Sequence, residues 1–394
     1  MREPTGRGGA ARARLRGRDR AVNALSRHEL EHPDGRRVLV YGALADGAGL
    51  GPGADTQLGE IHRRLDALTG EWIIVTPQRN VRPNDPEPVD DKERACPICP
   101  GGIELPFAYE AAVFENRFPS LLAEPPLPPV VAGETASAGG RCEVVVYTSR
   151  HGVSFGALTP NELGRLLAIW TDRSRELWAD DRHEFVLAFE NRGTDAGATL
   201  SHPHGQIYAF DHLPPIAKKK LAAHRVHRER EGGCLGCAVA AGDTRTVVDN
   251  ESFAVAVPFA PRWPYEVAVR ARRHGLGRLA DLAPAEQVDL ICALRDVALR
   301  YNAFFGEETP YLMTAQEAPR GEPDWHLAFE FFPLRRSRTA TKIRASVETA
   351  TGVFLNDVLP EVAATRLAEI ELSAPAVAAE HLFSVESVGL EVVS

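Results

Sequence analysis

The stretch Ser201–Gln206 (SHPHGQ) has the residue types needed for nucleophilic catalysis. Its two histidines stand at positions i and i+2, so on an extended segment both imidazoles face the same side. A neutral imidazole is a good nucleophile toward phosphorus, and a covalent intermediate divides one displacement into two easier steps. Pro203 stiffens the link, and Gly205 leaves room for a phosphate near the backbone. We predict that His202 binds a metal ion and that His204 is the nucleophile.

Gln206 favours group transfer over hydrolysis. Its amide can donate a hydrogen bond to a phosphoryl oxygen, but it cannot readily remove a proton from water. We therefore assign Gln206 a catalytic role beside His204. The alternative interpretation is that His202 and His204 both bind a metal or form a pH-sensitive surface pair.

Two Cys-x-x-Cys pairs are each followed by two distant histidines. Two thiolates and two imidazoles form a ligand set that zinc prefers in structural sites. Such a site has no open position, so each zinc would hold strands together without touching substrate. A redox pair is the alternative for a Cys-x-x-Cys motif, and a core histidine is the alternative for His326. The predicted ligands are Cys96, Cys99, His151 and His202 in the first site, and Cys234, Cys237, His274 and His326 in the second.

The same order of residues occurs twice along the chain. Residues 143–152 read EVVVYTSRHG, residues 266–275 read EVAVRARRHG, and the two His-to-His intervals are 51 and 52 residues. Matched order, strings and spacing predict an internal duplication into two similar α+β units. When His326 is aligned with His202, Ala328 takes the place of His204. The second unit is therefore predicted to lack the nucleophile.

Hydrophobic patterning predicts the elements that position these residues. We expect strands over 71–76, 142–147, 185–190 and 206–210, and a helix over 160–178 that starts after Thr159 with a proline at its first position. Residues 124–140 are predicted to form a surface loop. The predicted parts of the chain are a disordered or irregular extension (1–58), a catalytic half (59–215), a non-catalytic half (216–375) and a C-terminal tail (376–394).

Composition narrows the class of protein. The chain has 394 residues, 44% of them apolar and 25% charged, which is typical of soluble globular proteins. A net charge of −9 argues against a polycation that binds nucleic acid. No apolar run is long enough to span a membrane, and no secretory signal is evident. We expect a cytoplasmic protein that binds neither nucleic acid nor membrane.

Beyond these patterns, the sequence from Arg63 to Val358 resembles the galactose-1-phosphate uridylyltransferase family of the histidine triad superfamily. The resemblance implies an α+β fold of tandem histidine-triad-like halves, with antiparallel half-barrel sheets and helices packed outside. It also implies a homodimer with shared active sites. The motifs are LTGEW (68–72), Arg-x-x-Arg (79–82), FENRFP (114–119), FENRG (189–193), HPHGQ (202–206) and WPYE (263–266).

The resemblance also implies roles for individual residues. His204 would carry the uridylyl group, and Gln206 would steady the α-phosphate. The implied substrate-binding residues are Arg79 and Arg82 for phosphates, Asn116 and Asn191 for the nucleotide, Thr199 near the α-phosphate, Lys342 for a phosphate and Glu348 for sugar hydroxyls. Surface charges are the alternative for Lys342 and Glu348.

The chain departs from some family members in its second half. Those members hold iron there, but the matching positions here are Lys220, Gln316, Ala328 and Glu330, so we expect no iron. The second Cys–His set instead resembles the second zinc site of relatives such as ADP-glucose phosphorylase.

The leading functional hypothesis is ping-pong transfer of UMP from UDP-glucose to galactose 1-phosphate, so a nucleotide sugar and a sugar 1-phosphate are the expected partners. The same covalent chemistry on another pair, as in ADP-sugar phosphorolysis or a specialised pathway, is the nearest alternative. A zinc-organised binding protein without catalysis is an alternative from a different class.

Overall fold

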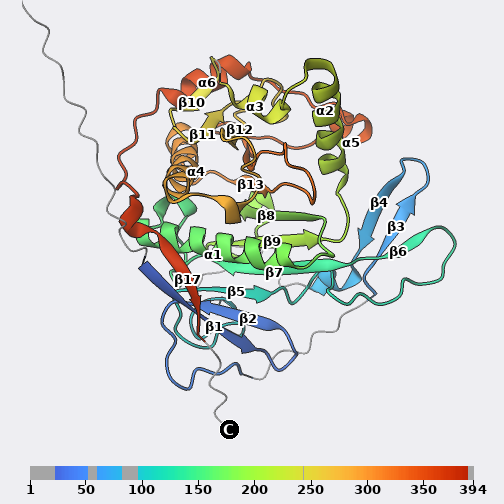
Figure 1. Ribbon diagram of the computed structural model, residues 1–394, viewed down its shortest axis with the longest axis vertical. Helices are drawn as coiled ribbons and strands as arrows, with labels where there is room; N and C mark the ends of the chain where they lie inside the picture. Colours follow the sequence, from blue (N-terminus) through green and yellow to red (C-terminus); the bar gives the residue numbers. More distant parts are fainter. Residues whose placement is uncertain (1–22, 52–59, 82–95, 243, 389–394) are drawn as a thin grey trace, which may run out of the picture.

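The computed structural model describes residues 23–51, 60–81, 96–242 and 244–388. Its centre is a mostly antiparallel twelve-stranded sheet, in the order β10-β11-β12-β14-β13-β8-β9-β7-β5-β2-β1-β17 (Figure 1). The strands are β1 (Asn23–Glu31), β2 (Arg37–Tyr41), β5 (Ala111–Glu115), β7 (Gly140–Val146), β8 (Phe185–Arg192), β9 (His204–Phe210), β10 (Thr246–Val248), β11 (Phe253–Ala256), β12 (Val267–Ala271), β13 (Tyr311–Gln316), β14 (Ala328–Pro333) and β17 (Phe383–Ser387).

The two sequence repeats share this one sheet. Strand β8 of the first repeat pairs antiparallel with β13 of the second, from Tyr311 opposite Arg192 to Gln316 opposite Leu187. The sheet runs from β10 to β17 without closing into a barrel. The predicted α+β class is therefore confirmed, and the two halves are joined edge to edge.

Smaller elements surround the sheet. The arm of β3 (His62–Asp66), β4 (Glu71–Val75) and β6 (Thr135–Ser137) projects to the right in Figure 1, and β15 (Arg335–Ser337) pairs with β16 (Ala340–Thr341). Strand β6 falls within the predicted loop 124–140. The helices are α1 (Pro160–Ala179), α2 (Pro215–Glu231), α3 (Leu235–Ala240), α4 (Pro284–Phe305), α5 (Ser346–Thr351) and α6 (Pro360–Ala368), with 3-10 turns η1 (Pro77–Val81), η2 (Phe155–Ala157), η3 (Thr194–Ala196), η4 (Leu279–Asp281) and η5 (Ala379–His381).

Helices α1 and α4 pack on one face of the sheet and form the main core with it. The predicted start of α1 is confirmed, because the Thr159 hydroxyl and the Glu162 carboxylate form a capping box there. None of the helices in the described part of the chain has the length and apolar character needed to cross a bilayer.

The same arginine–glutamate ion pair occurs in both halves and supports the internal duplication. In the first half, Arg150 donates from Nε and Nη2 to the Glu162 carboxylate at 2.8 and 2.5 Å. In the second half, Arg273 donates from the same two atoms to Glu286 at 2.6 and 3.0 Å. Each arginine precedes a predicted ligand histidine, and each glutamate lies in the first turn of α1 or α4. The repeat therefore fixes each histidine loop to the helix that follows it.

One sequence prediction is wrong: the extension over 1–58 is not irregular throughout. Residues 23–31 and 37–41 form a hairpin, and β2 pairs with β5 from Val38 opposite Phe114 to Tyr41 opposite Ala111. The tail also contributes β17, which lies parallel to β1. The strand β1 was missed because its polar residues do not alternate cleanly with apolar ones: Arg27 forms ion pairs with Asp172 and Glu176 of α1, and Glu29 pairs with Arg37 of β2. Residues 1–22 and 52–58 of the extension lie outside the described residues.

A buried ion pair joins α1 to the sheet. Arg173, which is 0% exposed, donates from Nε and Nη2 to the Glu143 carboxylate of β7 at 2.9 and 2.7 Å. Glu176 accepts from the same guanidinium at 2.6 Å. Because Glu143 is only 3% exposed, its charge depends on Arg173.

We predict that Arg173→Met lowers the free energy of unfolding by about 3–5 kcal/mol, since it leaves Glu143 buried without its counter-ion. Urea denaturation measures this. Arg182→Met is the control: the Arg182 side chain is 56% exposed, and its surface ion pairs are expected to contribute little to stability because water and salt screen them. Equal losses of unfolding free energy in the two variants would show that the buried ion pair contributes no more to stability than the surface pairs of Arg182.

Candidate active site and metal clusters

His204, the first residue of β9, is held in one orientation. Its Nδ1 lies 2.8 Å from the backbone carbonyl oxygen of His202. A carbonyl only accepts, so Nδ1 carries the proton and Nε2 presents its lone pair. Within the described part of the chain, Nε2 has no hydrogen-bond partner. Burial lowers the pKa of His204, and the nearby Arg192 lowers it further. A neutral imidazole with a free Nε2 is suited to attack phosphorus.

Gln206 faces the same side of the sheet as His204. Its Oε1 accepts a hydrogen bond from Asn116 Nδ2 at 3.2 Å. Asn116 is fixed in turn, because its Oδ1 accepts from the backbone N–H of Phe118 at 2.8 Å. This arrangement assigns the carbonyl of Gln206 to Asn116 and leaves the NH₂ group to donate to an oxygen of a bound phosphate.

The open face of β8 and β9 carries two more predicted residues. Arg79 donates to the Tyr208 hydroxyl at 3.2 Å, and Tyr208 lies two positions beyond Gln206 on the same face of β9. The Tyr208 ring also contacts Phe189 of β8, with ring centroids 5.1 Å apart. Side chains of a strand alternate between faces, so Asn191 lies on the same face as Phe189.

Gly205 has a different role from the one we predicted. A side-chain carbon there would lie 2.2 Å from the Tyr147 hydroxyl and 2.8 Å from the carbonyl oxygen of Phe189. The missing side chain therefore admits Tyr147 from the core, not a phosphate from solvent. Tyr147 is fully buried beneath the catalytic strand. Sequence alone did not identify it, because a tyrosine at the end of an apolar strand looks like ordinary core.

The four residues of the first predicted metal site come together. Their ligand atoms all lie within 4.8 Å of one another, and Cys99 Sγ is 3.3 Å from His151 Nδ1 and 3.4 Å from His202 Nδ1. The second nitrogen of His202 lies 2.7 Å from the carbonyl oxygen of Thr148, which fixes the ring. Burial lowers the pKa of His202 to about 4, which keeps the imidazole neutral as a metal ligand must be.

The second predicted cluster also forms, but with the ring of its buried histidine reversed. His326 Nε2 lies 3.4 Å from Cys234 Sγ and 3.5 Å from Cys237 Sγ, while its Nδ1 lies 2.7 Å from the carbonyl oxygen of Ala271. His274 Nδ1 is 3.6 Å from Cys237 Sγ. All four ligand atoms again lie within 4.8 Å of one another. Both clusters could therefore hold a metal ion.

The remaining predicted residues are less closely joined to His204. Lys342 Nζ donates to the Glu348 carboxylate at 2.5 Å, and Glu348 is 2% exposed. These two residues are thus paired with each other instead of standing as separate surface charges. Thr199 lies half-buried in the loop before His202. Arg82 lies outside the described residues.

In the second half, the position that corresponds to the site around His204 is filled by an ion pair and a glutamine. Lys220 of α2 donates to Gln316 at 2.7 Å and to Glu330 at 2.6 Å. Gln316 pairs with Ala328 across β13 and β14, where the first half has His204. An ammonium–carboxylate pair therefore closes this face, and the second half has no nucleophile there.

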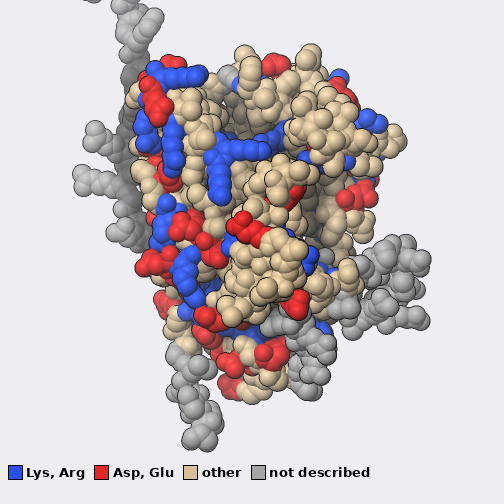
Figure 2. All heavy atoms as spheres, turned by 90° about the vertical axis from the view of Figure 1, so that its right-hand side faces the viewer, with Lys and Arg blue, Asp and Glu red and all other residues tan. Residues whose placement is uncertain are grey.

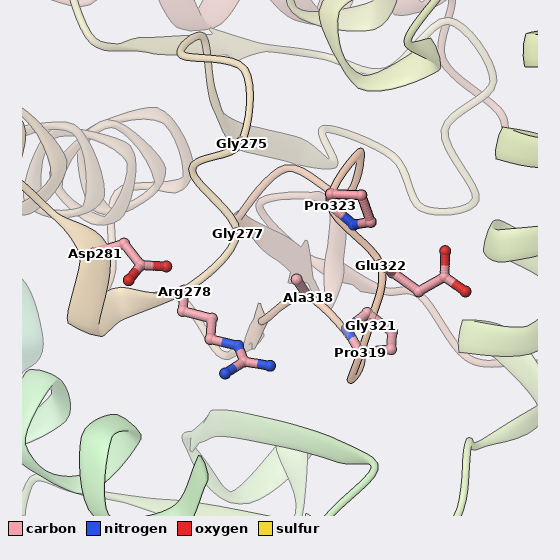
Figure 3. A pocket seen from close by; sticks show the side chains of 9 residues that line it. All are labelled: Gly275, Gly277, Arg278, Asp281, Ala318, Pro319, Gly321, Glu322 and Pro323. Atoms are coloured by element: carbon pink, nitrogen blue, oxygen red, sulfur yellow. The ribbon is translucent and has the colours of Figure 1, made fainter. Parts of the chain in front are cut away.

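A separate cavity of about 430 Å³ lies beside the second cluster (Figure 3). Arg278, Asp281 and Glu322 line it together with glycine and proline residues of two loops. The Arg278 guanidinium packs over the Trp178 ring at 3.9 Å from its centroid. The cavity contains none of the predicted catalytic or ligand residues.

The duplicated fold and the HPHGQ segment at the start of β9 are those of a nucleotidyltransferase of the histidine triad superfamily. Models of the galactose-1-phosphate uridyl transferase N-terminal and C-terminal domains match residues 54–214 and 206–382. The chain therefore belongs to the galactose-1-phosphate uridylyltransferase family.

Individual relatives agree with this assignment. The chain is 40% identical to a galactose-1-phosphate uridylyltransferase of Thermotoga maritima over 78% of its own length and 98% of the relative's. It is 35% identical to one of Streptomyces lividans, over 70% and 78%. A solved uridylyltransferase structure is 30% identical with a TM-score of 0.70, over 78% of this chain and 97% of that one. An Arabidopsis thaliana ADP-glucose phosphorylase shares the fold at 22% identity, with a TM-score of 0.60 over 79% and 100%.

The lowered pKa of His204 predicts a pH profile for its nucleotidylation. A group with a lowered pKa stays neutral as the pH falls past the ordinary imidazole value, so the rate should be flat between about pH 8 and 6.5 and decline only below that. Single-turnover loading of the enzyme with a nucleotide sugar measures the profile. A midpoint at or above about 6.5 would contradict the assigned environment of His204.

Proposed function

We propose that this protein transfers UMP from UDP-glucose to galactose 1-phosphate through a uridylyl group on His204. The observation that carries the proposal is the orientation of His204: Nδ1 is bound to the His202 carbonyl, and Nε2 faces the side of the sheet that carries Gln206. The 40% identity to the Thermotoga enzyme supports the choice of substrates.

In the first step, the lone pair of His204 Nε2 attacks the α-phosphorus of UDP-glucose. The bond from phosphorus to the bridging oxygen breaks, and glucose 1-phosphate leaves with that electron pair. The NH₂ group of Gln206 donates to a non-bridging oxygen as charge develops there. The hydrogen bond from Nδ1 to the His202 carbonyl stabilises the positive charge that the imidazole gains.

In the second step, a phosphate oxygen of galactose 1-phosphate attacks the same phosphorus. The phosphorus–nitrogen bond breaks, UDP-galactose forms, and His204 regains its lone pair. Gln206 cannot act as a general base toward water, so the intermediate persists until an acceptor binds. The acceptor needs no base, because its phosphate is already an anion.

We assign the substrate-binding roles to the residues that the family motifs indicate, of which Arg82 lies outside the described residues. Arg79 and Arg82 contact phosphates, Asn116 and Asn191 contact the nucleotide, and Thr199 lies near the α-phosphate. Arg79 is supported by its contact with Tyr208 beside Gln206. Figure 2 shows several Lys and Arg side chains, mixed with Asp and Glu, in the upper half of the face that carries α2 and α5, so a chain of net charge −9 still has local positive charge on its surface.

Lys342 and Glu348 complete the active site of a second copy in a homodimer. They are joined to each other within one chain, and the segment around them exposes apolar side chains that a partner would cover. The exposed fractions are 71% for Ile343, 51% for Val347, 57% for Val353, 53% for Leu355 and 69% for Leu359. A patch of this kind is typical of an interface. The Lys342 ammonium would then meet the sugar phosphate, and Glu348 the sugar hydroxyls.

Zinc fits both Cys–His clusters, because two thiolates and two imidazoles are its usual structural ligands. When bound, it would tie the Cys-x-x-Cys loops to the histidine loops and so hold His202 in place. None of the six cysteines forms a disulfide bond in the structure, so the thiols of both clusters are available as metal ligands. Iron is not expected in the second half, since Lys220 and Glu330 form an ion pair there.

We also retain the division into a catalytic half over 59–215 and a non-catalytic half over 216–375. It is supported by the nucleophile in one half and Ala328 in the other. The second candidate function is the same covalent chemistry on another nucleotide sugar, above all the phosphorolysis of ADP-glucose. It is favoured by the fold that this chain shares with the ADP-glucose phosphorylase and by the second Cys–His cluster.

We predict that the enzyme converts UDP-glucose and galactose 1-phosphate to UDP-galactose and glucose 1-phosphate faster than it phosphorolyses ADP-glucose. Product formation from the two substrate pairs, measured in parallel, decides between them. His204→Ala should abolish both reactions while retaining its metal, because His204 is not a ligand. Faster turnover of ADP-glucose with phosphate would assign the protein to the second candidate function.

We predict about two zinc equivalents per chain and no iron by elemental analysis. Cys96→Ser should lose about one equivalent and much of its stability, because the binding energy of a structural zinc is also folding energy. Cys292→Ser is the control, since Cys292 belongs to neither cluster. A single zinc equivalent in the parent chain would contradict the second metal site and would mean that His326 is a core histidine beside two thiols that bind no metal.

A further inference from the structure

The hairpin of β1 and β2 lies outside the part of the chain that the family models match, which begins at residue 54. It is nevertheless part of the central sheet, since β2 pairs with β5 along four residues. Strand β5 leads directly to Asn116, which binds Gln206. An element outside the matched region therefore adjoins the strand that supports the catalytic glutamine.

The two faces of β2 have different neighbours. Leu39 and Tyr41 join the main core under α1. Val38 and Val40 join a second cluster on the opposite face, which includes Ile98 of the Cys96–Cys99 turn. The hairpin thus forms the apolar support on which the first metal loop rests.

Arg36, just before β2, connects this support to the site by polar contacts. Its Nη1 donates to the Glu104 carboxylate at 2.9 Å and to the backbone carbonyl of Glu115 at 3.1 Å. Its Nε is held by Asp34 at 2.8 Å. The Arg36 and Glu104 side chains are only 11% and 9% exposed, so little water competes for these bonds.

The two acceptors of Arg36 Nη1 belong to different parts of the site. The backbone N–H of Glu104 donates to the carbonyl of Pro97 at 2.9 Å, inside the Cys96–Cys99 turn. Glu115 directly precedes Asn116. A single guanidinium therefore joins the metal loop to the strand end that holds Asn116.

We propose that Arg36 is a positioning residue, which fixes the Cys96–Cys99 loop relative to Asn116 and thereby relative to Gln206. The loop carries two ligands of the first cluster, whose His202 carbonyl orients the nucleophile. The proposal rests on the metal assignment made under the proposed function. It concerns a residue that touches neither substrate nor metal.

The adjacent Arg37 provides a matched control. It occurs on the same hairpin, but its guanidinium donates to Glu29 at 2.7 Å and contacts Glu176 of α1. Arg37→Met should therefore weaken the packing of α1 without releasing the metal loop. Arg36→Met removes the contacts to Glu104 and Glu115 while preserving most of the side-chain volume.

The test is timed alkylation of the zinc-loaded full chain with N-ethylmaleimide, followed by peptide mass mapping of each cysteine. In Arg36→Met, alkylation of Cys96 and Cys99 should be roughly tenfold faster, the lower end of the usual effect of losing support behind metal ligands. Cys234 and Cys237 should react at their parental rates. Nucleotide loading of His204 should also slow. Arg37→Met should show none of these changes, whatever its thermal stability.

Equal changes in the two variants, or parental rates in a folded Arg36→Met, would overturn the proposal. If Arg36→Met does not fold, Arg36→Lys replaces it: lysine can reach one acceptor at a time, so an intermediate acceleration is expected, and parental rates would overturn the proposal. Unprotected Cys96 and Cys99 in the parent chain would overturn the metal assignment instead. In that case the rate of His204 loading still decides the role of Arg36.

Discussion

The hydrogen bond between His204 Nδ1 and the carbonyl of His202 is the contact on which the site depends. It selects the tautomer, aims Nε2 and balances the charge that the ring gains during attack. Its geometry is set by where the backbone of His202 lies. That backbone is held by the first cluster, in which the His202 ring lies between Cys99 and the carbonyl of Thr148. In the proposed reaction, the first cluster would therefore act only by positioning His202.

The duplicated fold explains why one half can serve as scaffold. Both halves keep a Cys–His cluster and an arginine–glutamate bridge to the following helix. Among the described residues, the first half has His204 at the position of the proposed nucleophile, whereas the second half has Ala328 there. In the second half, Lys220 and Glu330 satisfy each other where a substrate would otherwise bind. Through the pairing of β13 with β8, this half adjoins the strand that lies beside β9, which begins at His204.

The sequence predicted what depends on local pattern or on spacing. The start of α1 was predicted from Thr159 and Pro160. Both ligand sets were predicted from the repeated order of Cys and His residues, and the structure brings the residues of each set together. It did not predict contacts whose partners are distant and individually ordinary. Tyr147 beneath Gly205 and Arg36 beneath the Cys96–Cys99 loop belong to this kind, because their roles arise only from packing. The hairpin over 23–41 was missed because charged residues mask its alternation.

The central claim is a covalent nucleotide on His204 that forms without an acceptor and resists water. The most direct measurement is the intact mass of the purified protein after mixing with UDP-glucose alone, followed by peptide mapping. The account predicts an added UMP group on the peptide that contains His204, removal of that group when galactose 1-phosphate is added, and no adduct in His204→Ala. UDP-glucose consumed without an adduct, or an adduct on another residue, would contradict it.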